Sequence, residues 1–371
     1  MKKILILTAG FGEGHNAAAR GVRAGLARVA PQMEVQLRDL FPETYGAFNE
    51  LVRKSYLALI NRWPRSWGYV YRWLDGMENF DERFRRFSKL KQNLANLLNG
   101  FQPDIVVSTF PAYPYLLDQI LGTSRTCKNI AVVTDSITVN AIWYRAPADY
   151  FLVANEQSAA VVCKGGVSSE KIKVFGFPVS PRFADFTNEE RRNSTALSSQ
   201  DRQQPSLLKP RVLYVINAGT TRAPDIVREL LGLEIQLTVT VGRAKKLRRG
   251  IEKVIAGHNS EVIGWTDEMP RLLCENHLLI GKAGGAMVQE TIAARCPMII
   301  NHVVSGQEEG NARLIVETNS GVIAKSPSEV VAQVEHAFAD DATQWREWSE
   351  NISKLSRPRA SLEIAEFLLS I

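Results

Sequence analysis

The sequence has few cysteines and no long apolar run. Its 371 residues include only four cysteines, which lie far apart: Cys127, Cys163, Cys274 and Cys296. Neither a zinc site nor a disulfide framework is indicated, which fits a reducing compartment. The longest stretch without a charged residue, 105–117, has 13 residues and two prolines. That is too short to cross a bilayer, which takes roughly twenty residues. We therefore expect a cytoplasmic protein without a transmembrane helix.

Length and composition indicate a globular protein of two domains. A chain of 371 residues with 45% hydrophobic and 23% charged residues is too long for one ordinary core and is typical of folded proteins. Residues 184–205 are polar and almost free of core residues, as linkers are. We expect domains at 1–183 and 206–345, joined by the linker 184–205, and a C-terminal helix at 346–371 that could pack back on the first domain.

Both parts of the chain alternate short apolar runs with helical patterns. Residues 4–7 are apolar without polar alternation, as expected for a strand that is buried on both faces of a parallel sheet. Residues 17–29 then show the period of a helix. Similar runs at 212–216 and 278–280 precede helical patterns in the second part. This alternation favours an α/β fold with two doubly wound domains.

A glycine-rich loop with a histidine follows the first expected strand. Glycines such as Gly12 and Gly14 let the backbone approach a ligand closely, and the start of the next helix offers N–H groups to an anion. The spacing of Gly10, Gly12 and Gly14 does not fit the dinucleotide fingerprint. His15 carries an imidazole suited to general-base work near neutral pH. The alternative is a surface histidine that caps the helix.

A second glycine pair, Gly284 and Gly285, lies between an expected strand and a helix. Its N–H groups, with Lys282 beside them, suit a diphosphate. Glu290, further along the same helix, can accept hydrogen bonds from ribose hydroxyls. Taken singly, each piece is better explained as an ordinary turn or a solvated acidic helix start, but their combination in this order favours a site for a diphosphate and a ribose. The next loop adds amides and a carboxylate: Gln307, Glu308 and Asn311.

Cationic and aromatic residues are concentrated between positions 45 and 91. Residues 51–91 hold ten Lys or Arg against four Asp or Glu, a surplus equal to the net charge of +6 of the whole chain. Eleven aromatic residues lie between 45 and 91. Such a mixture is typical of a segment that docks on an anionic membrane, although these aromatics could equally belong to a core. No nucleic-acid module is recognisable. The expected docking residues are Trp63, Trp67, Arg83, Arg85 and Arg86.

Two motifs together resemble glycosyltransferase family 28. The pattern K-A-G-G-x-x-x-x-E-x-x-A-x-x-x-P at 282–297, followed by G-Q-E-x-G-N at 306–311, resembles the donor site of that family. The sequence is most similar to the monogalactosyldiacylglycerol synthases and the processive diacylglycerol glucosyltransferases, whose G-x-G-H-x-x-A-A motif stands at 12–19 and whose Val-Thr-Asp stands at 133–135. The resemblance covers nearly the whole chain.

The resemblance implies a GT-B fold, in which two Rossmann-like doubly wound domains face each other across a cleft. It implies a UDP-sugar donor, inversion at the anomeric carbon, and neither a cofactor nor an obligatory metal. Glu290 would hold the ribose, the glycine pair the diphosphate, and Gln307 and Glu308 the sugar. His15 would sit at the acceptor, beside the loop of Gly12 and Gly14, with Asp135 as the alternative base.

The chain departs from the family pattern at two functional positions. The loop 217–222, after the first strand of the second domain, has a single glycine, Gly219, where the family has a glycine-rich loop that contributes to the donor site. Asn140 stands where the family often has a histidine, three residues before Trp143.

The predicted function is transfer of a hexose from UDP-galactose or UDP-glucose to a lipid acceptor, expected to be diacylglycerol, in glycolipid synthesis. The predicted location is peripheral, on the inner face of the cell membrane. Two alternatives stay open. One is another GT-B enzyme that uses UDP-N-acetylglucosamine, either a lipid-linked transferase or a 2-epimerase. The other is a UDP-sugar sensor without catalysis. No oligomeric state is indicated.

Overall fold

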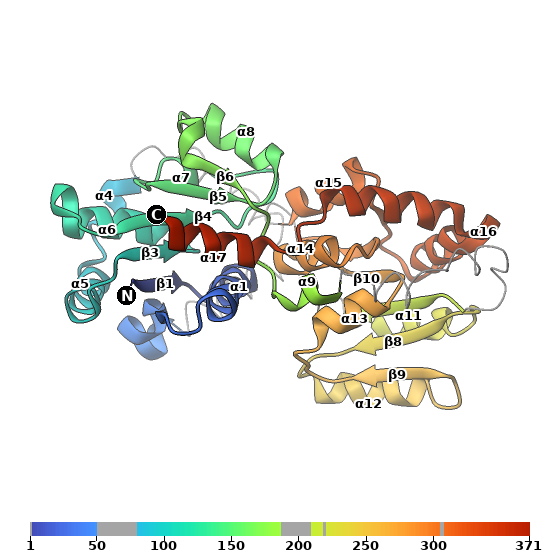
Figure 1. Ribbon diagram of the computed structural model, residues 1–371. Helices are drawn as coiled ribbons and strands as arrows, with labels where there is room; N and C mark the ends of the chain where they lie inside the picture. Colours follow the sequence, from blue (N-terminus) through green and yellow to red (C-terminus); the bar gives the residue numbers. More distant parts are fainter. Residues whose placement is uncertain (1, 50–79, 187–208, 218–219, 305–307) are drawn as a thin grey trace. The chain divides into compact units, whose positions relative to one another are not determined.

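A computed structural model describes residues 2–49, 80–186, 209–217, 220–304 and 308–371 (Figure 1). Its contacts divide the chain into two compact units. Unit 1 consists of Met1–Pro181, Val304–Gly310 and Arg359–Ile371, and unit 2 of Arg182–Val303 and Asn311–Pro358. Most of the expected linker 184–205 lies outside the described residues.

Unit 1 is built on a six-stranded parallel sheet, in the order β2-β1-β3-β4-β5-β6. Strand β1 lies between β2 and β3, with Ile4 opposite both Val35 and Ile105. The strands are β1 (Lys3–Thr8), β2 (Glu34–Asp39), β3 (Ile105–Ser108), β4 (Lys128–Val132), β5 (Tyr150–Val153) and β6 (Ile172–Val174).

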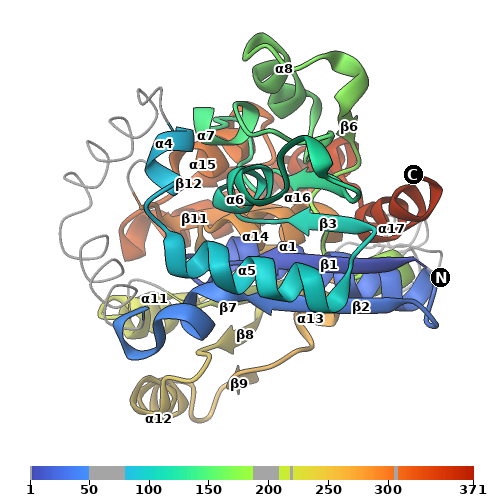
Figure 2. The ribbon, with the colours of Figure 1, turned by 90° about the vertical axis from the view of Figure 1, so that its left-hand side faces the viewer.

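Helices cover both faces of this sheet. The labelled helices of unit 1 are α1 (Glu13–Val29), α4 (Phe80–Phe84), α5 (Ser88–Phe101), α6 (Ala112–Leu121), α7 (Ala141–Tyr144), α8 (Glu156–Lys164) and α17 (Ala360–Ser370). Leu5 and Leu7 pack with apolar residues of α5 and α6, which lie together on one face (Figure 2). Ile4 and Ile6 point to the other face, where α1 contacts β1. Because both faces are covered, these side chains are completely buried, as their unbroken apolar run predicts.

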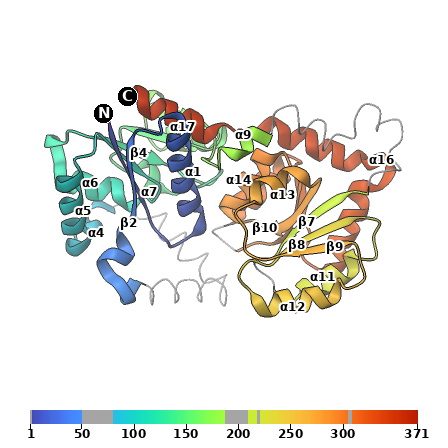
Figure 3. The same ribbon diagram turned by 60° about the horizontal axis from the view of Figure 1, so that its bottom comes forward.

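The last helix of the chain lies against the first (Figure 3). Gly25 of α1 permits this approach, since a Cβ there would lie 2.1 Å from the carbonyl oxygen of Ser361. The Nζ of Lys2 also donates to the carbonyl oxygen of Leu369, at 2.8 Å. The segment 346–371, expected as one helix, is the end of one helix and the separate α17. The break contains Pro358, which has no N–H to continue a helix.

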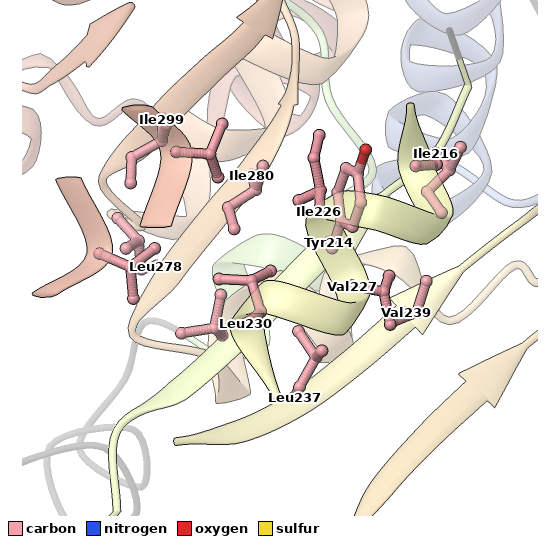
Figure 4. Packing of buried hydrophobic residues seen from close by; sticks show 14 of the residues in the cluster. Tyr214, Ile216, Ile226, Val227, Leu230, Leu237, Val239, Leu278, Ile280 and Ile299 are labelled. Atoms are coloured by element: carbon pink, nitrogen blue, oxygen red, sulfur yellow. The ribbon is translucent and has the colours of Figure 1, made fainter. Parts of the chain in front are cut away.

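Unit 2 holds the second six-stranded parallel sheet, in the order β12-β11-β10-β7-β8-β9. Side chains of β7, β8 and β10 pack against α11 in its core (Figure 4). The strands are β7 (Arg211–Val215), β8 (Gln236–Thr240), β9 (Ser260–Ile263), β10 (Leu278–Lys282), β11 (Met298–His302) and β12 (Gly321–Ile323). The prediction of two doubly wound parallel sheets is therefore confirmed.

The remaining helices follow the strands of unit 2. They are α9 (Arg182–Phe186), α11 (Ala223–Leu230), α12 (Lys245–Val254), α13 (Met269–Glu275), α14 (Gly285–Ala294), α15 (Glu309–Glu317) and α16 (Pro327–Leu355). Helix α15 begins in the segment Val304–Gly310 of unit 1, and α16 is interrupted by non-helical backbone at 339–342. Among the helices described, none is long and apolar enough to span a membrane.

Candidate active site

The carboxyl ends of the parallel strands gather the polar residues of each unit at one edge of its sheet. In folds of this type ligands bind beyond that edge. In unit 1 the glycine loop follows β1, Thr109 follows β3, and Thr134 comes shortly after β4. Since β1, β3 and β4 are neighbours, the three segments meet although they are far apart in the sequence.

His15 is the centre of this edge in unit 1. Its Nδ1 lies 2.7 Å from the carbonyl oxygen of Thr109 and 3.0 Å from the Oγ1 of Thr134. A carbonyl oxygen only accepts, so Nδ1 carries the hydrogen and Nε2 keeps a lone pair. Gly12 is the N-cap of α1, without a side-chain cap. His15 is thus half-buried and contacts the residues that follow β3 and β4. It is not the surface histidine capping the helix that the alternative described.

The surroundings of His15 keep it uncharged. The ring of Phe110 meets it edge to face at 5.2 Å, and that of Trp143 lies 6.3 Å away. Burial lowers the pKa of His15 to about 4, and the hydrogen bond to Thr109 opposes this shift only in part. Near neutral pH the ring is therefore neutral, and Nε2 is able to take a proton.

Asp39, which the sequence patterns did not single out, anchors the glycine loop. Its carboxylate accepts from the backbone N–H of Gly10 at 2.8 Å and from that of Phe41 at 3.1 Å. Burial raises the pKa of Asp39, while these two hydrogen bonds lower it. Tyr113 links the ends of β1 and β2 beside this loop. Its hydroxyl donates to the carbonyl oxygen of Thr8 and accepts from the N–H of Leu40. Asp39 could have been suspected from its place at the carboxyl end of a strand.

Asp135, the alternative base, shapes the loop before α7. Its Oδ2 accepts from the backbone N–H of Asn140 at 3.1 Å. The side chain of Asn140 in turn caps α7 by accepting from the N–H of Ile142 at 3.0 Å. The asparagine that replaces the family's histidine therefore has a structural role here. Asp135 follows directly on Thr134, so both candidate bases belong to one edge of unit 1.

The second glycine pair opens α14 in unit 2. Gly284 is the N-cap, without a side-chain cap, and the first turn of the helix is half-buried. Asn311, which is 7% exposed, holds this loop because its Nδ2 donates to the carbonyl oxygen of Ala283 at 3.1 Å. Glu290 lies about one turn and a half along α14 and is half-buried, as is Lys282 at the end of β10. Asn311 thus holds the loop that precedes α14 in unit 2.

Glu308 belongs to the segment Val304–Gly310 of unit 1. Its Oε2 accepts from the backbone N–H of Val304 at 3.0 Å, and its own N–H donates to the carbonyl oxygen of Val304 at 3.0 Å. The side chain is only 5% exposed. One carboxylate oxygen therefore ties Glu308 to the backbone of Val304.

The basic and aromatic window is described only in part. Two of its expected docking residues lie outside the described residues, Trp63 and Trp67. The same holds for two of the expected donor-site residues, Gly219 and Gln307. The side chains of Arg83, Arg85 and Arg86 are exposed, whereas Phe80 is buried and Phe84 and Phe87 are half-buried in the core. In the described part, then, these three arginines face solvent, while the aromatic residues between 80 and 87 pack in the core. Phe48 is different, with 65% of its surface exposed.

Known proteins are similar to this chain over nearly its whole length, and a family model matches part of it. A family model described as monogalactosyldiacylglycerol (MGDG) synthase matches residues 15–179. Residues 15–179 of the chain are thus similar to that family. A probable monogalactosyldiacylglycerol synthase of Glycine max is 27% identical over 99% of this chain and 71% of its own length. A processive diacylglycerol beta-glucosyltransferase of Bacillus subtilis is 25% identical over 99% of this chain and 95% of its own length.

Solved structures share the fold of this chain. MurG of Acinetobacter baumannii matches all of both chains with a TM-score of 0.63 and 14% identity. The UDP-GlcNAc 2-epimerase of Neisseria meningitidis, bound to UDP-GlcNAc, also matches all of both chains, with a TM-score of 0.59 and 14% identity. These similarities support the GT-B fold. Within the described ranges, no group of three or more His, Cys, Asp or Glu side chains could hold a metal ion.

The low pKa of His15 predicts a specific loss of stability in acid. The unfolded chain binds a proton near pH 6.5 and the folded chain near pH 4, so the stabilisation is present above pH 6.5 and is lost as the pH falls toward 4. Between pH 7 and 4.5, the free energy of unfolding should fall by about 2 kcal/mol more in the wild type than in His15→Gln. Urea titrations at both pH values measure this difference.

The matched control is His336→Gln, since His336 is exposed on α16. This variant should show the same dependence of stability on pH as the wild type. A His15→Gln protein that did so as well would contradict the buried, neutral histidine.

Proposed function

We propose that this chain transfers a hexose from UDP-galactose or UDP-glucose to diacylglycerol, with inversion at the anomeric carbon, in glycolipid synthesis. The observation that carries the proposal is the neutral His15 with an accepting Nε2, at the edge of unit 1 where ligands bind in such folds. It is supported by the relatives, which are described as synthases of monogalactosyldiacylglycerol and as diacylglycerol glucosyltransferases.

The proposed reaction is a single displacement. Nε2 of His15 takes the proton of the acceptor hydroxyl, whose oxygen attacks the anomeric carbon as the bond from that carbon to the UDP oxygen breaks. One displacement inverts the configuration. His15 is preferred to Asp135 as the base because its Nδ1 is the donor in the hydrogen bond to Thr109, so Nε2 is chemically suited to accept.

On the donor side, we propose that the residues around α14 bind UDP. The N–H groups of Gly284 and Gly285 and the positive end of the helix would balance the diphosphate charge together with Lys282, without a metal. Glu290 would accept from the ribose hydroxyls. The loop residues Gln307 and Glu308 would bind the sugar, and Asn311 and Gly219 would also contribute to the donor site.

The function predicts sugar transfer that depends on His15. With a UDP-hexose and diacylglycerol in mixed micelles, the wild type should release UDP and form a monohexosyl lipid, which mass spectrometry detects. This activity should survive the addition of EDTA. His15→Gln should lower turnover by about 10²–10⁴-fold, the contribution of a general base, and leave UDP affinity unchanged. Epimerisation of UDP-N-acetylglucosamine without lipid, or UDP binding without turnover, would contradict the proposal. Loss of activity in EDTA that magnesium restores would contradict its metal-free step.

Glu290→Ala tests the donor site separately. Removing the carboxylate leaves the ribose hydroxyls without a charged acceptor, which should weaken UDP binding by about 1.5–3 kcal/mol. Titration calorimetry with UDP measures this. Glu350→Gln on α16 is the control, because Glu350 pairs with Lys354 at the surface of that helix. Equal affinity in Glu290→Ala and the control would remove Glu290 from the site.

We also propose that the segment 45–91 docks the enzyme on anionic membrane. Binding to vesicles should rise with the fraction of anionic lipid and fall with added salt, since each cation near the surface contributes about 1 kcal/mol. Changing Arg83, Arg85 and Arg86 together to glutamate should reduce flotation with such vesicles.

The matched control carries the same charge change on exposed residues of α12 in unit 2: Lys245, Lys246 and Arg249. The control should float like the wild type. Equal losses in the two triple variants would indicate attraction by net charge alone and overturn docking through 45–91.

A further inference from the structure

Two oxygen atoms from different strands meet one nitrogen of His15. The carbonyl oxygen of Thr109 lies 2.7 Å from Nδ1 and the hydroxyl oxygen of Thr134 lies 3.0 Å from it. Thr109 follows β3 and Thr134 follows β4, so both contacts depend on neighbouring strands of unit 1. Thr134 is itself half-buried.

The chemistry of these atoms decides which one donates. If the hydroxyl of Thr134 donated to Nδ1, that nitrogen would carry a lone pair, and two acceptors would face each other at 2.7 Å without a hydrogen between them. Nδ1–H must therefore donate to Thr109, and the Thr134 oxygen, at a normal hydrogen-bond distance, shares the same hydrogen as a second acceptor. A neutral imidazole with Nδ1 protonated has its lone pair on Nε2.

The two oxygens also select one orientation of the ring. Turning the imidazole by 180° about its bond to Cβ would bring a C–H group to the position of Nδ1 and leave both oxygens without that donor. The rings of Phe110 and Trp143 contact the imidazole but offer it no acceptor at the positions that the oxygens occupy. Since Thr109 contributes a backbone atom, Thr134 is the side chain through which this selection can be altered.

We propose that Thr134 is a positioning residue, which together with the Thr109 carbonyl holds His15 in the Nδ1–H tautomer and directs Nε2 to the acceptor hydroxyl. This inference rests on the proposed function in assigning the hydroxyl to a lipid acceptor. The tautomer and the ring orientation are properties of the protein alone.

The experiment compares Thr134→Val, which keeps the shape and removes the hydroxyl, with Thr134→Ser, which keeps the hydroxyl. Turnover and KM are measured with UDP-hexose and diacylglycerol. The full chain is also labelled with ¹⁵N-histidine, and the ring nitrogens of His15 are assigned by their absence in His15→Gln. Thr318→Val is the control, because it removes the same hydroxyl from a threonine that is also hydrogen-bonded, to the carbonyl oxygen of Leu314, but stands in unit 2.

In the wild type at pH 7, Nδ1 should have the shift of a protonated nitrogen and Nε2 that of an unprotonated one. Thr134→Val should move both shifts toward a mixture of tautomers. It should lower turnover about 2- to 10-fold, as expected for one lost neutral hydrogen bond, with KM for the UDP-sugar unchanged. Thr134→Ser should restore the wild-type spectrum and most of the turnover, and Thr318→Val should change neither.

A wild-type spectrum with the proton on Nε2, or a Thr134→Val protein with unchanged spectrum and turnover, would overturn the proposal. Failure of the proposed function is a separate result. A wild type that transfers no sugar overturns the transfer reaction, whereas a tautomer that depends on Thr134 in the same protein still supports the positioning role.

Discussion

The parallel pairing of β1 with its two neighbours is the constraint on which the site of unit 1 depends. Pairing with β2 sets Thr8 opposite Asp39, and pairing with β3 sets Leu7 opposite Ser108. The loop after β1 therefore emerges between Asp39 on one side and Thr109 on the other. A shift of β2 by one residue would turn the side chain of Asp39 to the opposite face and remove the anchor of Gly10, and a shift of β3 would move the Thr109 carbonyl away from His15.

The two glycine loops are held in the same way in the two units. A glycine backbone close to a ligand brings no side chain to fix it, so the fixing groups come from elsewhere. In unit 1 the carboxylate of Asp39 binds the N–H of Gly10, and in unit 2 the amide of Asn311 binds the carbonyl of Ala283, beside Gly284. In unit 1 the anchor binds the N–H of the glycine itself, and in unit 2 it binds the carbonyl of the residue before the glycine pair. The N–H of Gly284 itself donates to the carbonyl oxygen of Lys282 at 2.8 Å, so this turn and the Asn311 anchor together hold the loop in place before a ligand arrives.

Sequence patterns predict those parts of the structure that depend on local information. The fully buried run Ile4–Leu7 is visible because both faces of a covered strand need apolar residues, and the glycine loops are visible because glycines between a strand and a helix start are a known anion-binding pattern. The family motif adds His15 and Glu290. Asp39, Tyr113 and Thr134 are different, since each acts on a residue between 29 and 119 positions away. Their roles follow from strand order, which no local pattern encodes.

Thr109 shows a second reason why part of the site could not be predicted from the sequence. It binds His15 through its backbone carbonyl, an atom that every residue type provides, so its identity carries no signal of this role. The same contact has a consequence for the chemistry. The pKa of His15 is set by burial against a neutral carbonyl, and neither partner at Nδ1 carries a charge that would stabilise an imidazolium. In the proposed reaction such a weak base accepts a proton efficiently only once the attacking oxygen has become more acidic, that is, once its bond to the anomeric carbon has begun to form. Deprotonation and the departure of UDP would then be coupled, which would protect the donor from being consumed while no acceptor is in place.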